Sequence, residues 1–233
     1  MKNSQAYNFD AKPDFEHAVE MTAAGQKLLL LPQRAVWWPA NRTLFVADVH
    51  LGKAAIFQRH AIPLPSGTTH SDLQRLTDLI MATSVERLVI LGDWLHAQEA
   101  HNPDVHAEID HWRQAHRSLN VMLVPGNHDR LAGEIPPQWE MQVVGTRHED
   151  APFVYAHYPD ADEAGYVLSG HLHPAVLLSG HGKQQLKPPC FWVRPDYMVL
   201  PAFGSFTGRA CITPTQPDRV YVVTARAVLP LSR

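Results

Sequence analysis

The chain has 233 residues, 45% of them hydrophobic, and a formal net charge of -3 at pH 7. This length suits one α/β domain with a sizeable core, or at most two small domains. A charge so close to zero excludes the strong basic excess that by itself indicates binding to nucleic acid or to a membrane surface. The two cysteines, Cys190 and Cys211, are too few and too far apart for a disulfide framework or a thiolate metal cluster. We therefore expect both to be reduced cysteines of a cytosolic fold.

The N-terminal residues show no pattern of a secretion signal. Residues 1–20 are polar and lack an apolar stretch followed by a cleavage site. The longest purely aliphatic run, residues 28–31, is far too short to span a bilayer. We therefore expect a cytoplasmic protein with a single domain over residues 1–233, in which residues 1–24 form a loosely ordered arm.

The first half of the chain alternates between strand and helix patterns. The predicted strands of this half cover residues 28–31, 35–38, 43–47, 87–91 and 120–124. Apolar residues at helical spacing predict a helix over residues 71–83. A second helix is expected over residues 104–118, with Asn102 as its N-cap and Pro103 at its first position. Alternation of this kind predicts an α/β sheet that contains parallel strands.

The second half has a different character, because no long helical period appears after residue 138. Its predicted strands cover residues 142–144, 153–156, 166–169, 175–178, 197–200 and 219–223. Residues 181–190 are rich in Gly, Lys and Pro and indicate an exposed loop. The two halves together predict an α/β (α+β) fold of stacked sheets flanked by helices.

Five of the predicted strands lead directly into polar residues that can bind metal ions. The residues concerned are Asp48, His50, Asp93, Asn127, His128, Asp129, His157, His171 and His173. Loops at the carboxyl ends of strands face one crevice in open α/β sheets, so we expect these side chains to converge. Carboxylates, imidazoles and an amide oxygen suit divalent metals. The glycines before Asp93, Asn127 and His171 permit tight turns and close backbone approach.

The ordered motifs D-x-H, G-D, G-N-H-D, H and G-H-x-H resemble the signature of the calcineurin-like metallophosphoesterases over about residues 43–175. The resemblance implies a β-sandwich flanked by helices, with two metal ions at the carboxyl ends of the strands. Carried over residue by residue, the ligands of the first ion would be Asp48, His50 and His173, those of the second Asn127, His157 and His171, and the bridging carboxylate that of Asp93.

The same resemblance implies two catalytic residues. His128 would lie over the substrate phosphate, and Asp129 would orient it. A hydroxide shared by the two metal ions would attack the phosphorus in line, while His128 stabilises charge or protonates the leaving oxygen. The mixed nitrogen and oxygen ligands fit Mn²⁺, Fe or Zn²⁺.

A longer stretch, about residues 28–210, is similar to the ligase-associated DNA damage response endonucleases of the PdeM family. The phrases that carry this similarity are DVHLGKAAIFQRHAIPLPSG, GDWLHA, AHYP, GHLHP and PAFGSFTG. They imply a Mn²⁺-dependent phosphodiesterase or endonuclease that acts on DNA, in association with an ATP-dependent DNA ligase, a helicase and an exonuclease. The residues alone leave open a phosphoesterase of small substrates, such as a nucleotide, a cyclic nucleotide or a lipid pyrophosphate. A non-catalytic scaffold is disfavoured, since every expected ligand and His128 are present.

Basic residues near these motifs have two interpretations. Lys53, Arg59 and His60 follow the first motif and either contact a polynucleotide backbone or belong to a solvated helix face. Arg130 follows G-N-H-D and either faces a phosphate or forms an ion pair with Glu134 four residues later.

Other side chains near the motifs are harder to assign from the sequence. Trp94 and Trp112 are either stacking platforms for bases or, more commonly for tryptophan, core residues. His96 lies three residues after Asp93 and is expected close to the metal ligands.

Overall fold

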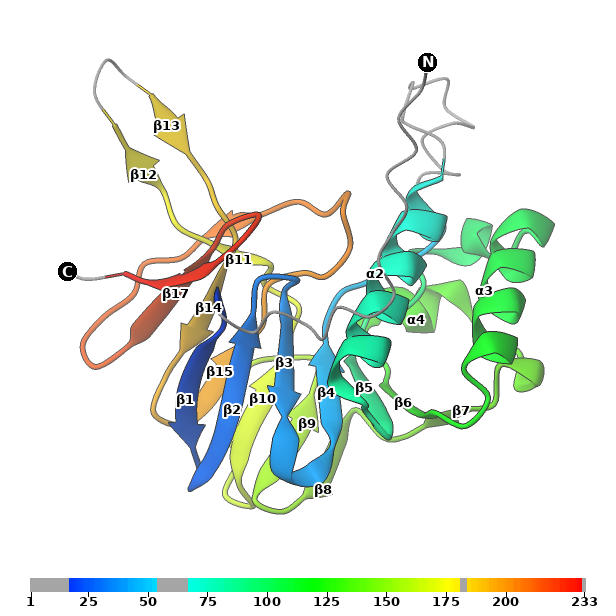
Figure 1. Cartoon of the computed structure of the whole chain (residues 1–233), viewed down its shortest axis with the longest axis horizontal. Coiled ribbons are helices and arrows are strands. Elements are labelled where there is room, and N and C mark those ends of the chain that lie inside the picture. Colours follow the sequence, from blue (N-terminus) through cyan, green and yellow to red (C-terminus); the bar gives the residue numbers. More distant parts are fainter. Residues whose placement is uncertain (1–16, 54–66, 181–183, 232–233) are drawn as a thin grey trace.

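The computed structural model describes residues 17–53, 67–180 and 184–231. Two seven-stranded sheets stack against each other, and the helices cover the outer face of the first sheet (Figure 1). The first half of the chain builds the first sheet and the helices, and the second half builds the second sheet. Most of the short additional strands lie at the end of the molecule away from the helices (Figure 1).

The first sheet has the strand order β1-β2-β3-β4-β5-β6-β7. Its strands are β1 (Val19–Ala23), β2 (Gln26–Leu31), β3 (Ala35–Trp38), β4 (Thr43–Val46), β5 (Arg87–Leu91), β6 (Asn120–Val124) and β7 (Met141–Val143). The pairs from β1 to β4 are antiparallel, whereas those from β4 to β7 are parallel. The carboxyl ends of β4, β5 and β6 therefore lie along one edge.

The helices are α2 (Thr68–Thr83), α3 (Pro103–Ala115) and the short α4 (Asn127–Ala132). Single 3-10 turns occur at η2 (Pro39–Asn41), η3 (Gln98–Ala100) and η4 (Pro137–Trp139). The Asn102 side chain accepts a hydrogen bond from Val105 N at 3.1 Å, which confirms its predicted capping role. The helix α3 ends at Ala115 rather than at residue 118.

The second sheet has the strand order β18-β17-β14-β15-β10-β9-β8. Its strands are β8 (Arg147–Asp150), β9 (Phe153–Ala156), β10 (Tyr166–Ser169), β14 (Cys190–Val193), β15 (Tyr197–Val199), β17 (Arg219–Val223) and β18 (Val228–Pro230). The parallel pairing of β9, β10 and β15 brings their carboxyl ends to a common edge.

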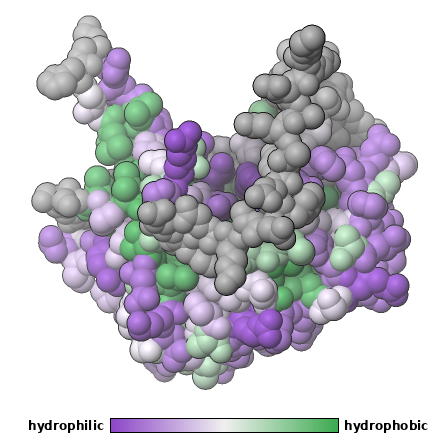
Figure 2. Space-filling view, in the orientation of Figure 1, coloured by the Kyte–Doolittle hydropathy of each residue, from purple (hydrophilic) through white to green (hydrophobic). Residues whose placement is uncertain are grey.

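Two small two-stranded sheets lie beside the large ones. They pair β11 (Pro174–Ala175) with β16 (Ala210–Cys211), and β12 (Leu178–Ser179) with β13 (Gln185–Leu186). The β12–β13 hairpin projects from the body of the molecule (Figure 1). Figure 2 shows hydrophobic surface over this region, where Leu177 and Leu186 are 47% and 69% exposed.

Two buried apolar clusters hold the layers together. One lies between the first sheet and the helices and includes Leu44, Leu88 and Leu76. The other lies between the sheets and includes Phe45, Val89 and Phe153. Neighbouring residues of one strand, such as Leu44 and Phe45, point into different clusters, so both faces of the parallel strands are apolar. This packing on both sides fixes the strand ends that carry the polar residues.

The α/β fold of stacked sheets flanked by helices is confirmed, but some predicted boundaries are wrong. The expected arm of residues 1–24 is incorrect for Val19–Ala23, which pair with β2; residues 1–16 lie outside the described part. The predicted strand at 175–178 is divided between β11 and β12. The predicted loop at 181–190 includes β13, and Cys190 begins a buried strand. Among the described residues, no helix is long and apolar enough to cross a membrane.

Candidate metal centre

All nine residues predicted from the sequence lie at the carboxyl ends of strands, and both large sheets contribute. Asp48, His50, Asp93 and residues 127–129 follow β4, β5 and β6 of the first sheet. The three remaining residues follow β9 and β10 of the second sheet, and they are His157, His171 and His173. The distances between their side chains show that the structure brings these segments together.

Asp48, His50 and His173 form a first group of possible metal ligands. The His50 Nε2 and His173 Nε2 atoms are 3.4 Å apart, and His173 Nε2 is 3.6 Å from Asp48 Oδ1. Asp48 and His50 are buried. The backbone N–H of His171 donates to Asp48 Oδ2 at 2.9 Å, which joins the ends of β4 and β10.

Asn127, His157 and His171 form a second group. His157 Nε2 is 3.1 Å from Asn127 Oδ1 and 3.1 Å from His171 Nδ1. The Asp93 carboxylate lies between the two groups, because its Oδ2 atom is 3.7 Å from His50 Nε2 and 3.5 Å from His157 Nε2. One carboxylate oxygen therefore faces ligands of both groups, which is the position that a bridging residue requires.

The hydrogen bonds of the histidines show that this donor set fits divalent cations. His157 Nδ1 donates to Leu91 O at 3.1 Å, and His173 Nδ1 donates to Gly208 O at 3.1 Å. In a neutral imidazole the other nitrogen then carries a lone pair. The Nε2 lone pair of His157 faces Asn127 Oδ1 and Asp93 Oδ2, which also have lone pairs, and a cation relieves this repulsion. The residues present therefore fit a metal centre.

Burial disfavours the charged forms of His50 and Asp93. Burial, and then the neighbouring His173, His128 and His96, lower the pKa of His50 far below its usual value, so its imidazole is neutral, as a metal ligand must be. Burial raises the pKa of Asp93, and the Asp48 carboxylate adds to this effect. A negative charge at Asp93 is thus costly unless cations lie beside it.

The backbone at the site is held in an uncommon conformation. Ten non-glycine residues of the described chain have a positive φ angle, and five of them are predicted metal ligands. These five are Asp48, His50, Asp93, His171 and His173, with φ between 47° and 73°. The left-handed region is unfavourable for such residues and is maintained at functional sites by the surrounding structure. Here backbone hydrogen bonds join the ligand loops, since Asp48 N donates to Gly92 O at 3.0 Å and His50 N donates to Asp93 O at 2.8 Å.

The predicted role of Asp129 in orienting His128 is wrong. The Asp129 carboxylate instead accepts hydrogen bonds from Leu95 N at 3.0 Å and Gly126 N at 2.9 Å. Burial raises its pKa to about 6, against the lowering effect of these bonds. His128 Nδ1 donates to the backbone oxygen of His96 at 2.6 Å. Asp129 therefore joins the two loops, and the backbone of His96 orients His128.

His96 is a part of the site that sequence reasoning placed only roughly. Its ring stacks on that of His128, with centroids 4.7 Å apart and planes at 17°. Its Nδ1 atom is 3.0 Å from His50 Nδ1. His50, His96 and His128 thus form a further group with metal-ligand geometry. Burial, and then Lys53 and His128, lower the pKa of His96 to about 4.

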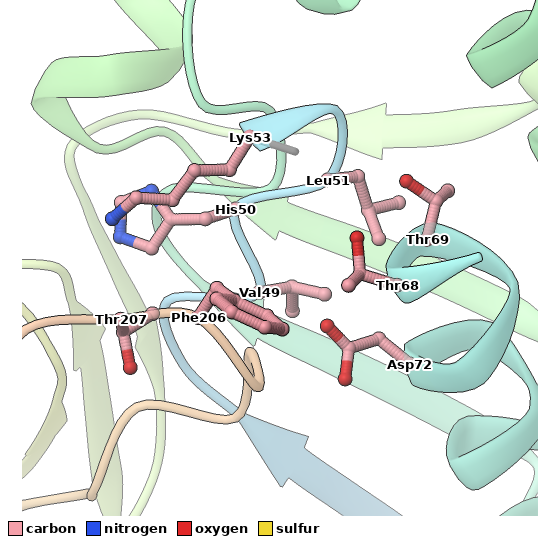
Figure 3. A pocket seen from close by; sticks show the side chains of 9 residues that line it. All are labelled: Val49, His50, Leu51, Lys53, Thr68, Thr69, Asp72, Phe206 and Thr207. Atoms are coloured by element: carbon pink, nitrogen blue, oxygen red, sulfur yellow. The ribbon is translucent and has the colours of Figure 1, made fainter. Parts of the chain in front are cut away.

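A small pocket beside His50 is lined by Lys53, one of the basic residues that the sequence analysis considered for contact with a polynucleotide. Figure 3 shows Lys53 and His50 extending to the same side of this pocket, with Phe206 and Thr207 of the β15–β16 loop below them. Burial lowers the pKa of Lys53. Arg59 and His60, with the same predicted role, lie outside the described residues.

Two other open interpretations are resolved by the structure. Trp94 and Trp112 are buried in the core beneath the helices, which excludes base stacking. Arg130 does not form the predicted ion pair with Glu134 within the described structure; its Nη2 donates to Tyr158 Oη at 3.3 Å. The Tyr158 ring packs on His171, with centroids 4.4 Å apart. Arg130 therefore lies beside the second ligand group.

A methyl group at Gly126 is expected to disrupt the centre. Its Cβ atom would lie 2.1 Å from Asp93 Oδ1 and 2.7 Å from Asp93 N, and neither atom can move without shifting a ligand loop. We expect Gly126→Ala to lower the free energy of unfolding by about 1–3 kcal/mol, the usual cost of overpacking, and to reduce metal content. Denaturant unfolding and metal analysis measure both effects. Gly180→Ala is a control for added bulk, because the atom nearest to its Cβ position, Gln184 Cβ, lies at 3.7 Å, an ordinary contact distance; an equal loss in both variants would contradict this reasoning.

Stacked mixed sheets with aspartate, histidine and asparagine ligands at the strand ends define the metallophosphoesterase class. The crystal structure of the Pseudomonas putida nuclease MPE is similar to this chain, with 41% sequence identity, a TM-score of 0.82, and coverage of 92% of this chain and 100% of that one. The chain belongs to the family of that nuclease, and it is a calcineurin-like metallophosphoesterase.

Two other solved structures have weaker similarity. The Aquifex aeolicus protein AQ665 is 18% identical, with a TM-score of 0.37, over 60% of this chain and 82% of that one. The phosphoesterase Yfce from E. coli is 11% identical, with a TM-score of 0.41, over 80% of this chain and 95% of that one. These similarities are too low to bear on function. No protein-family model and no curated protein sequence matches the chain.

Proposed function

We propose that this metallophosphoesterase is a phosphodiesterase that cleaves DNA, an endonuclease of DNA repair, and that it uses two divalent metal ions. The observation that carries the proposal is the position of Asp93 Oδ2, which faces both His50 and His157. A carboxylate shared in this way is the feature that distinguishes a two-metal site from a single-metal site. The nuclease named among the similar structures supports the choice of a nucleic-acid phosphodiester.

The proposed ligands are Asp48, His50 and His173 for one ion and Asn127, His157 and His171 for the other, with Asp93 shared. Mn²⁺ is the proposed metal, and Fe and Zn²⁺ have ligand preferences that also fit. When bound, such ions activate a water molecule near neutral pH and neutralise the phosphate oxygens. Because Nδ1 of His128 donates to the His96 carbonyl, its Nε2 atom is the one left for the substrate, and in the imidazolium form it would stabilise the phosphate or deliver a proton to the leaving oxygen.

Arg130 adds a positive charge where a substrate would enter. Its guanidinium is exposed and touches Tyr158, whose ring packs on His171. An arginine can contact two oxygens of one phosphate, which suits a diester that approaches the second ligand group. In the cell, we propose association with an ATP-dependent DNA ligase, a helicase and an exonuclease.

Removal of the metal is expected to abolish activity. Asp48, Asp93 and His157 are buried together, so a metal ion would balance the charge of two carboxylates that are shielded from water. We expect chelated protein to lose at least about 99% of its activity, as for removal of a Lewis acid, and to recover it with Mn²⁺. Activity that persists after verified metal removal would contradict the mechanism.

The substrate class is tested with a generic aryl phosphodiester and its matching monoester, in Mn²⁺, with the His128→Ala protein as the blank. We expect preference for the diester, followed by cleavage of oligodeoxynucleotides. Preference for the monoester would shift the function to a phosphatase of small substrates. Absence of activity on all of them would leave an enzyme of narrow specificity or the non-catalytic scaffold, and metal analysis would decide between the two.

A further inference from the structure

A second cavity, of about 330 Å³, is lined by arginines and lies outside the metal-ligand groups. The arginines are Arg34 in the β2–β3 turn, Arg75 in α2, and Arg209 just before β16. The other lining residues, none of them charged, are Pro32, Gln33, Pro189, Val223, Thr224 and Ala225. The volume lies in the range of roughly 300–1,000 Å³ that is typical of small-ligand pockets. We call this the arginine cavity.

The positive charges of the arginine cavity are mostly not paired with carboxylates. Arg34 Nη1 donates to the carbonyls of Ala202 and Gly204 at 3.1 and 3.2 Å, which holds the side chain without neutralising it. Arg75 Nη1 lies 3.1 Å from Asp72 Oδ1. Among the described residues, Asp72 is the one acidic side chain bonded to these arginines. Three guanidinium groups and one carboxylate leave a local charge of +2.

The guanidinium groups also keep hydrogen-bond donors free. A guanidinium has five N–H groups, yet within the described chain the bonds of Arg34 and of Arg209 all come from Nη1. Arg75 Nε is buried without a partner there. Burial, and then the charges of Arg75 and Arg209, lower the pKa of Arg34 to about 10. Free donors and mutual repulsion both favour an anion in this cavity.

One loop separates the arginine cavity from the first ligand group. The carbonyls of Ala202 and Gly204 face Arg34, while the N–H of Gly204 donates to Asp48 O at 3.1 Å on the other side. Figure 3 shows Asp72, the partner of Arg75, beside the part of this loop that carries Phe206. Farther along the loop, Gly208 O accepts from His173 Nδ1. The same loop therefore contacts both Arg34 and the first ligand group, so the two sites lie on either side of it.

We propose that the arginine cavity binds a phosphate group, and that this phosphate belongs to the nucleic-acid strand whose cleavage takes place at the metal centre. Arginine forks match phosphate oxygens in geometry and charge. Contacts of this kind fix the register of a strand without reading its sequence. The inference rests on the proposed function, because it assigns a second contact to the same polymeric substrate. It also gives a chain of net charge -3 a local means of holding DNA.

The test places a negative charge in the wall of the cavity at Ala225. This residue is exposed in the turn between β17 and β18, so a longer side chain fits without disturbing the core. Ala225→Glu and Ala225→Gln have side chains of nearly equal size and differ in charge. For the Mn²⁺-loaded enzyme, we expect the KM for a single-stranded oligodeoxynucleotide to be about tenfold higher in Ala225→Glu than in Ala225→Gln. We also expect the dependence of this KM on salt concentration to weaken by about the amount of one phosphate contact. The KM ratio of the two variants is compared with their KM ratio for the aryl diester, which is too short to contact both sites.

A second arm tests phosphate alone, with no need for catalysis. Inorganic phosphate is added to the chelated protein, and the melting temperature is recorded for wild type and both Ala225 variants. A phosphate site is supported if phosphate raises the melting temperature of wild type and Ala225→Gln but not that of Ala225→Glu. If the KM for the oligonucleotide is nevertheless equal in the two variants, the ligand of the site is free phosphate and not the strand. Equal behaviour of Glu and Gln in both arms would overturn the proposal. Failure of every diester assay would refute the proposed function, while the phosphate arm would still decide this site.

Discussion

Asp93→Asn is expected to abolish activity and to lower the metal content. The substitution removes one charge and little else, because an asparagine oxygen can still accept the hydrogen bond that His128 N donates to Asp93 Oδ1 at 2.9 Å. The lost charge is the one that faces both His50 and His157. We expect kcat/KM to fall by about 1,000-fold, the scale for removal of a group that stabilises transition-state charge. Steady-state kinetics and elemental analysis of dialysed protein measure the two effects.

Stability of the metal-free protein separates this effect from misfolding. Burial and the Asp48 carboxylate raise the pKa of Asp93, which means that its negative charge is unfavourable in the metal-free folded protein. Neutral asparagine removes that cost, so the chelated variant should melt no lower than chelated wild type. Asp78→Asn, at an exposed position of α2, is the matched control. Near-wild-type turnover with full metal content would rule out the bridging role of Asp93.

The apolar periods in the sequence predicted the parallel half of the fold well, because β4, β5 and β6 are buried on both faces and consist almost wholly of apolar residues. Their carboxyl ends had to meet at one edge, which is why the convergence of Asp48, Asp93 and Asn127 could be predicted. The way in which the two sheets pack face to face could not be predicted in such detail. It depends on which apolar faces match in three dimensions.

The sequence analysis missed strands of both polar and apolar composition, such as β8 and β14 (Cys190–Val193). β8 (Arg147–Asp150) is wholly polar, and it forms the edge of its sheet. Its pairing is supported by the Arg87–Asp150 ion pair at 2.6 Å, a contact between residues far apart in the chain. β1 (Val19–Ala23) had a usable signal, since Met21 and Ala23 are buried and alternate with exposed residues. The polar composition of the preceding residues obscured it.

The site was predicted at the level of residues and not at the level of contacts. Asp129 follows His128 directly, and the family resemblance therefore implied that its carboxylate orients the His128 ring. The short helix α4 instead directs the carboxylate toward Leu95 N and Gly126 N. The real partner of His128 is the backbone of His96, a carbonyl that no side-chain pattern reveals. Backbone acceptors become visible only once the loops are placed.

His128→Ala is expected to leave both metal ions bound and to remove most of the rate. Its Nδ1 atom donates to the His96 carbonyl, so its ring is held in place without any metal. Loss of a general acid or of a donor to the phosphate costs roughly 100- to 10,000-fold in kcat. We expect kcat on an oligodeoxynucleotide, whose alkoxide leaving group needs a proton, to fall within that range, with metal content unchanged. His111→Ala, an exposed histidine of α3, controls for loss of an imidazole elsewhere.

The geometry also defines the competing outcome. His50, His96 and His128 lie close enough to hold one ion together, so His128 itself is a possible ligand. If it is one, His128→Ala loses metal as well as rate, and His96→Ala does the same. If His128 acts on the substrate, metal content stays constant. If it acts as the general acid, a substrate whose leaving group needs no proton retains much of the rate in the variant, because departure of a good leaving group does not depend on the acid. Loss of metal without such rescue would move His128 from the catalytic residues to the ligands.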